Sequence, residues 1–210
     1  MNLAGMISLI RYDLRDTDSG SYRWSDAELT RHINRAVAEL SESLPQPVKA
    51  TLPTMAGSRD LDISSLTDRI MVVAVEFPLG ASPPSYQQFA IWGDTMTIMS
   101  GGEPDGSNCS IYYGALHVLD AQGTTLPSKY EDLVAAGVGG YAAIEWASYA
   151  INRVNIGGTM TPRDFLDWGN RKLKDFRQEL RRLGRRNVVR LSSLYAPYNQ
   201  VVSRTADYGP

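Results

Sequence analysis

The hydrophobic pattern of the chain changes period twice, and this change limits the folds that the chain can adopt. Up to residue 46, apolar residues recur every three or four positions, which is the period of an amphipathic helix. At 47–125 they form short β-branched or aromatic runs between Gly, Pro, Ser and Asp, which is typical of strands. At 126–184 the helical period returns. We therefore predict an α+β fold in which a four-helix unit is split by an inserted small antiparallel β module.

The second predicted helix has a clear start signal. Ser25 and Glu28 form a capping-box pattern, in which each side chain accepts a free backbone N–H of the first turn. Trp24 lies just before the cap and can pack onto Leu29 as a hydrophobic staple. We favour this local role for the aromatic pair Tyr22 and Trp24. The alternative is direct contact of these residues with a partner.

The inserted module contains six predicted strands, which favour a small antiparallel sandwich or an open barrel. FAIW-GD-TMTIM predicts a tight hairpin, because Gly93-Asp94 suits the positive φ of a two-residue turn. Cys109 lies in a predicted strand as a small core residue. A single cysteine cannot form an internal disulfide.

The later helices contain both start signals and unfavourable residues. Ser128 with Glu131 predicts a second capping box, and Thr161-Pro162 predicts the start of the last helix. The helix between them contains three glycines at 137–140, each costing about 1 kcal/mol relative to Ala. Close packing of two helices is the explanation that we favour. The last helix is expected to end at Gly184.

Charge is distributed unevenly along the chain. Residues 171–190 contain nine Arg or Lys and two acidic residues, a net of +7, so the other 190 residues carry −9 of the total −2. The predicted basic face of the last helix consists of Arg171, Lys172, Lys174, Arg177, Arg181 and Arg182. Such a face fits an acidic protein partner, and it can also contact DNA phosphates without reading sequence. We favour the protein partner.

The segment 185–210 predicts a C-terminal arm that orders against another surface. It is too apolar for a simple solvated tail and too irregular for a core element. Arg and Tyr concentrate binding energy at interfaces. The candidate anchors of the arm are Arg185, Arg186, Arg190, Leu191, Leu194, Tyr195, Tyr198 and Tyr208.

No catalytic, cofactor-binding or metal-binding pattern accompanies these features. GxSxG, HExxH, CxxC and the glycine-rich nucleotide motifs are absent from the sequence. We expect His32 on the polar side of the second helix and His117 in a strand, both as structural histidines. The acidic residues Asp13, Asp16 and Asp18 are expected to form a solvated turn. No apolar run approaches the roughly 20 residues that span a bilayer, and no secretory signal is evident, so we expect assembly in the cytoplasm.

Three segments carry a resemblance to a known family. The opening RYDLRD and YRWSDAELTRHINRAVAELS, the later YYGALHVLDAQGTTLPSKYEDLVAAGVGGYAA, and the terminal arm together resemble tailed-bacteriophage head-to-tail connector proteins, also called adaptor or head-completion proteins. The resemblance implies a helix bundle with an inserted β module, assembled as a ring, typically a dodecamer, in the neck beneath the portal. It also implies that the arm docks on the portal, and that the next tail or neck protein and packaged DNA are further contacts. The chain would then be a non-enzymatic virion protein at the head-tail junction.

Three alternatives stay open at the level of sequence. The basic face also fits a nucleic-acid-binding packaging factor. A tail terminator or stopper of the neck belongs to the same structural class. A ligand-binding β module of a hydrolase is a weaker alternative, because no base and nucleophile are placed together.

Overall fold

The computed structural model describes residues 1–150 and 161–194, with side chains as far as 187. These residues form two compact units. The helical unit consists of Met1–Gln46 and Leu116–Leu183, and the β module consists of Pro47–Ala115 with the described residues from Gly184. The predicted α+β fold, with four helices and small antiparallel sheets, is confirmed.

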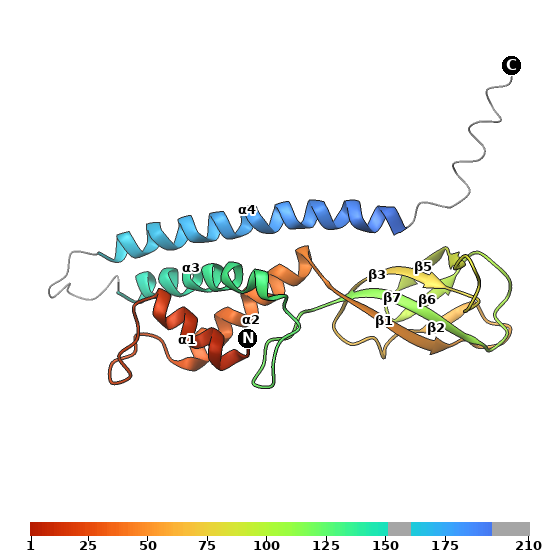
Figure 1. Cartoon of the computed structure of the whole chain (residues 1–210), viewed down its shortest axis with the longest axis horizontal. Helices are drawn as coiled ribbons and strands as arrows, with labels where there is room; N and C mark the ends of the chain where they lie inside the picture. The colour runs from red at the N-terminus through yellow and green to blue at the C-terminus, as the bar shows by residue number, and fades with distance from the viewer. Residues whose placement is uncertain (151–160, 195–210) are drawn as a thin grey trace, which may run out of the picture. The chain divides into compact units, whose positions relative to one another are not determined.

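Four α-helices and one 3₁₀ turn make up the helical elements of the described chain (Figure 1). They are α1 (Leu3–Asp13), α2 (Asp26–Ser43), η1 (Ser128–Tyr130), α3 (Glu131–Ala150) and α4 (Pro162–Leu194). The predicted capping box opens α2: Ser25 Oγ accepts from the Glu28 N–H, and Glu28 accepts from the Ser25 N–H. None of these helices, over the residues described, combines the length and apolarity that crossing a membrane requires.

One hydrophobic core joins all four helices of the helical unit. Met6 and Ile10 of α1 are fully buried, as are Leu29 and Ile33 of α2. Helices α3 and α4 add apolar residues at three- and four-residue spacing, which places them on one face of each helix. These residues are Val134, Val138, Tyr141 and Ala142 of α3, and Leu173, Phe176, Leu180 and Leu183 of α4.

The glycines of α3 allow α4 to approach closely, as predicted. A Cβ at Gly137 would lie 3.0 Å from the Phe176 ring, and one at Gly140 would lie 2.8 Å from Leu173 Cγ. In the opposite direction, a Cβ at Gly169 of α4 would lie 2.9 Å from the Gly140 carbonyl oxygen. The helical backbones therefore meet where each contributes a residue without a side chain.

Two predicted helix boundaries were wrong. Helix α4 passes through Gly184 and continues to Leu194, because glycine weakens a helix without forcing it to end. Proline does restrict the residue before it, and the next proline is Pro197. The second capping box is also absent: the 3₁₀ turn η1 has no side-chain cap, and Glu131 instead accepts a hydrogen bond from the Met1 amino group.

The β module contains two small sheets. The four-stranded sheet has the order β1-β7-β3-β4, and the three-stranded sheet has the order β2-β6-β5. The strands are β1 (Gln46–Pro53), β2 (Asp60–Asp62), β3 (Arg69–Glu76), β4 (Tyr86–Gln87), β5 (Phe89–Trp92), β6 (Thr95–Ile98) and β7 (Asn108–Ala115). The short strand β4 is the one that the sequence did not predict. Both sheets contribute to a second core that includes Leu61, Val75, Met96 and the fully buried Cys109.

The predicted hairpin is confirmed. Strands β5 and β6 pair antiparallel, with Trp92 opposite Thr95. Gly93 supplies the positive φ of the turn, at 60°. Arg69 fixes this turn, because its guanidinium donates to the Gly93 carbonyl oxygen at 3.3 Å and pairs with Asp94 at 3.1 Å.

Candidate functional site

The loop between α1 and α2 is held by a buried ion pair. Arg11, 6% exposed, donates to Asp16 Oδ2 at 2.7 Å, and Asp16 is only 3% exposed. The same guanidinium donates to the Trp24 carbonyl oxygen at 2.8 Å and to Asp26 Oδ1 at 2.7 Å. The expected solvated acidic turn was therefore wrong for Asp16, because a buried arginine supplies the partner that water would otherwise supply.

The aromatic pair before α2 divides between core and surface. Trp24 is 2% exposed and belongs to the same core as Leu29, and its indole N–H donates to the Ala142 carbonyl oxygen at 3.1 Å. Tyr22 is 44% exposed, and its ring lies 3.5 Å from the guanidinium carbon of Arg11. Trp24 thus fixes the entry into α2, whereas Tyr22 lies at the surface.

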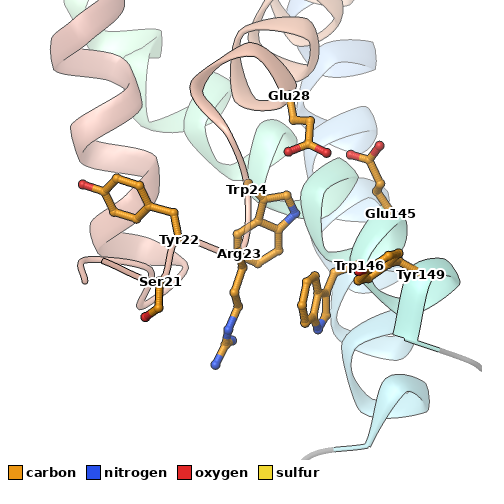
Figure 2. Close-up of a pocket in the computed structure, with 8 residues that line it drawn as sticks. All are labelled: Ser21, Tyr22, Arg23, Trp24, Glu28, Glu145, Trp146 and Tyr149. Carbon is orange, nitrogen blue, oxygen red and sulfur yellow. The ribbon is translucent and has the colours of Figure 1, made fainter. Parts of the chain in front are cut away.

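A pocket of about 480 Å³ opens beside this loop in the helical unit. It is lined by Ser21, Tyr22, Arg23, Trp24, Glu28, Glu145, Trp146 and Tyr149. Figure 2 shows the indole rings of Trp24 and Trp146 next to each other, and their centroids are 5.7 Å apart. The sequence-predicted Tyr22 and Trp24 are therefore joined by aromatic residues from the end of α3.

Glu145 is the most strongly paired carboxylate of this pocket. It accepts hydrogen bonds from Arg31 and His32. Burial by itself would raise the pKa of Glu145, but the two hydrogen bonds outweigh it and hold that pKa below its ordinary value. The predicted position of His32 on the polar side of α2 was wrong: its side chain is buried because it faces α3 and Glu145.

His117 follows β7 and does not lie in a strand. Its Nε2 lies 3.1 Å from the Leu44 carbonyl oxygen, and its Nδ1 lies 3.1 Å from the Thr125 carbonyl oxygen. Burial lowers the pKa of His117, against the opposing effect of these two carbonyl groups. Over the described residues, no group of three His, Cys, Asp or Glu side chains is arranged to hold a metal ion.

The basic face of α4 is largely exposed opposite the buried side of the helix. Arg171, Lys174, Arg177, Arg181 and Arg182 are exposed, and Lys172 is half-buried with its Nζ 5.5 Å from the Trp168 ring. Two of these residues have carboxylate partners within the chain. Arg177 Nε lies 3.9 Å from Glu39 Oε2, and Arg182 pairs with Glu179.

Other cations of α4 lack such a partner. Among the residues that the structure describes, no carboxylate lies within ion-pair distance of Arg171, Lys174, Arg181, Arg185 or Arg186. Because these five charges are not neutralised by ion pairs within the described chain, they are available to an acidic surface or to phosphates.

The proposed anchors of the arm fall into three groups. Arg185 and Arg186 are exposed residues of α4. Arg190, Leu191 and Leu194 lie in the last turns of the same helix. Tyr195, Tyr198 and Tyr208 lie outside the described residues.

Comparison with known proteins identifies the family. A sequence model of the SU10 adaptor protein family matches residues 1–190. The chain belongs to this family. It is therefore a structural adaptor protein of a bacteriophage and a component of the virion. No curated protein sequence matches the chain.

Sequence reasoning missed part of the pocket beside the loop between α1 and α2. Arg23, Trp146 and Tyr149 complete the pocket around Trp24, but Trp146 is more than 100 residues away along the chain. The available signal was the WASY motif near the end of α3, where two aromatic residues are three positions apart and share a helix face. Nothing in the sequence connects that face to the loop before α2.

Proposed function

We propose that this adaptor forms a ring between the portal of the capsid and the tail. The ring would complete the head after DNA packaging, give the tail a docking platform and leave a conduit for DNA. The observation that carries the proposal is the charge distribution: exposed cations of α4 lack carboxylate partners among the described residues, while the rest of the chain is acidic. A ring requires head-to-tail contacts between two different, complementary faces of each subunit.

The portal contact is assigned to the C-terminal residues from Arg185 onward. Exposed arginines next to apolar and tyrosine residues combine charge, contact area and directional hydrogen bonds. Repetition around a ring would multiply each weak contact. The resemblance to connector proteins implies twelve copies, with the next tail or neck protein on the other side.

Two truncations test this assignment with portal rings from the same phage. Removing 195–210 leaves α4 whole, whereas removing 185–210 also takes the exposed Arg185 and Arg186. We expect co-sedimentation with portal rings to be weakened by the first truncation and abolished by the second. Binding unchanged in both truncations would refute the portal role of this segment. Circular dichroism of each variant controls for loss of the helical unit.

A nucleic-acid-binding packaging factor is the second candidate, because the same cations of α4 can neutralise phosphates. The two functions differ in their salt dependence. If DNA binding is the main function, the isolated protein should bind duplex DNA with an affinity that falls about a thousandfold or more between 50 and 200 mM salt. Tight portal binding with only weak DNA binding favours the adaptor ring.

A further inference from the structure

One face of the three-stranded sheet combines carboxylates with the most exposed large apolar side chain given for the described chain. Trp92 is 91% exposed at the end of β5. The strand register places Trp92, Thr95 and Asp62 in one row across the sheet. The next row consists of Ala90, Thr97 and Asp60. Side chains alternate between faces along a strand, so both rows share one face, opposite the buried Leu61 and Met96.

This outer face of β2-β6-β5 is acidic, and hydrogen bonds hold its turn and its two aspartates. Arg69 holds the turn that follows Trp92 through the Gly93 carbonyl oxygen and Asp94. Thr97 donates to Asp60, and the Ser64 N–H donates to Asp62 at 2.8 Å, which contributes to lowering the pKa of Asp62. Neither aspartate has a cationic partner within ion-pair distance among the described residues. The sequence 47–115 contains three basic and seven acidic residues, a net of −4.

Three exposed basic residues on one side of α4, called here the α4 stripe, have a spacing that matches the spacing of Asp60 and Asp62. Lys174, Arg181 and Arg185 recur at seven and four residues, which places them on one side of the helix, opposite the buried Leu173, Phe176 and Leu180. Arg181 and Arg185 are separated by about 6 Å along the helix axis. Asp60 and Asp62 are separated by about 7 Å along their strand. Two arginines can therefore meet two aspartates at once.

The width of the three-stranded sheet matches the diameter of a helix such as α4. From β2 to β5 the sheet measures about 10 Å, which is close to the diameter of a helix with its side chains. A helix that lies along the middle strand β6 therefore spans the sheet from Asp60 and Asp62 on one side to Trp92 on the other. A planar guanidinium or the aliphatic stem of a lysine can stack on the indole ring, which would otherwise be left in water.

We propose that the outer face of β2-β6-β5 binds the α4 stripe of a second copy of this chain. Trp92 is the apolar anchor, and Asp60 and Asp62 are the acceptors for Arg181 and Arg185. The contact joins two different faces, so it is head-to-tail and propagates from copy to copy. It rests on the proposed ring and names the surface that closes each subunit interface.

Loss of either the Trp92 side chain or the two aspartate charges should weaken assembly of the subunits. We expect Trp92→Ala and the pair Asp60→Asn/Asp62→Asn each to lower the subunit association constant about tenfold or more, measured by sedimentation velocity with portal rings present as template. Two matched controls lie in the same module. Met55→Ala removes another exposed apolar side chain, 70% exposed, and Glu103→Gln/Asp105→Asn removes two other negative charges. Both controls should assemble as the wild type does.

A charge exchange separates contact between copies from contact within one chain. One variant carries Asp60→Arg/Asp62→Arg, and the other carries Arg181→Asp/Arg185→Asp. Each alone should fail to assemble, because like charges would meet at every interface. Mixed in equal amounts, the two variants should form rings in which they alternate.

Each result decides between the proposals. If the variants of the acidic face assemble as the wild type does, this interface is refuted and the ring adaptor stands. If mixing fails to restore assembly, the contact between copies is also refuted, whether or not combining the changes in one chain restores it. If the wild type forms no ring even on portal rings, the proposed function and this interface fall together.

Discussion

Arg11 donates a hydrogen bond of 2.7 Å to Asp16, and both side chains are buried. This pair connects the last turns of α1 to the loop that leads into α2. Because Arg11 also holds the Trp24 carbonyl oxygen, the same guanidinium sets where the Trp24 ring enters the core. The position of the pocket beside this loop therefore depends on one buried cation.

Replacing Arg11 should destabilise the helical unit strongly. Arg11→Ala leaves Asp16 buried without its ionic partner, and we expect the free energy of unfolding to fall by about 3–5 kcal/mol. Urea unfolding followed by circular dichroism measures the change. Arg163→Ala is the matched control, because Arg163 is an exposed arginine of α4, and its cost should stay within about 0.5 kcal/mol. Equal effects of the two substitutions would contradict the role of the buried pair.

Two substitutions of Trp24 should separate its volume from its hydrogen bond. Trp24→Ala leaves a cavity in the core and should cost about 3–5 kcal/mol. Trp24→Phe keeps most of the ring volume but loses the N–H bond to the Ala142 carbonyl oxygen, and that lost bond should cost about 1 kcal/mol. The same urea titration measures both. A Phe variant as unstable as the Ala variant would show that shape matters more than volume here.

Because α3 and α4 pack closely, two glycine-to-alanine substitutions should change the stability of the protein in opposite directions. Gly169→Ala would place a methyl group 2.9 Å from the Gly140 carbonyl oxygen, so we expect a loss of about 1–3 kcal/mol. Gly139→Ala would place one at an ordinary 3.5 Å from Trp168, and the better helix propensity of Ala should then stabilise by up to about 1 kcal/mol. Thermal unfolding of the two variants checks the signs. Destabilisation by Gly139→Ala would show that this part of the interface is tighter than its distances indicate.

His117 should make stability depend on pH. Its pKa is lowered in the folded protein by burial, so the unfolded chain binds more protons as the pH falls below the ordinary value of 6.5. The contribution of neutral His117 to stability is therefore complete above about pH 6.5 and is lost progressively below it. We expect His117→Gln to reduce the difference between unfolding midpoints in urea at pH 7.5 and pH 5.5. An unchanged difference would assign the pH dependence to other groups.

The helical positions were predictable because their signals are local. The stripe of Met6 and Ile10, the cap at Ser25 and the turn at Gly93 depend on neighbours within a few residues. Helix α4 was predicted to end at Gly184 because glycine is common at helix ends, but its backbone can also continue as helix. The extra strand β4 has two residues, too short for any alternation of apolar and polar side chains.

The sequence by itself determined the α+β fold class and the concentration of positive charge near residues 171–190. These properties follow from the hydrophobic period and from charge counts, which depend only on residues that are close together in the sequence. Only the tertiary structure decided that Asp16 and His32 are buried with partners, that Trp146 meets Trp24, and that Trp92 shares a face with Asp60 and Asp62. These relationships join side chains that are distant along the chain or on different strands, and their energies exist only after folding has removed the water between them.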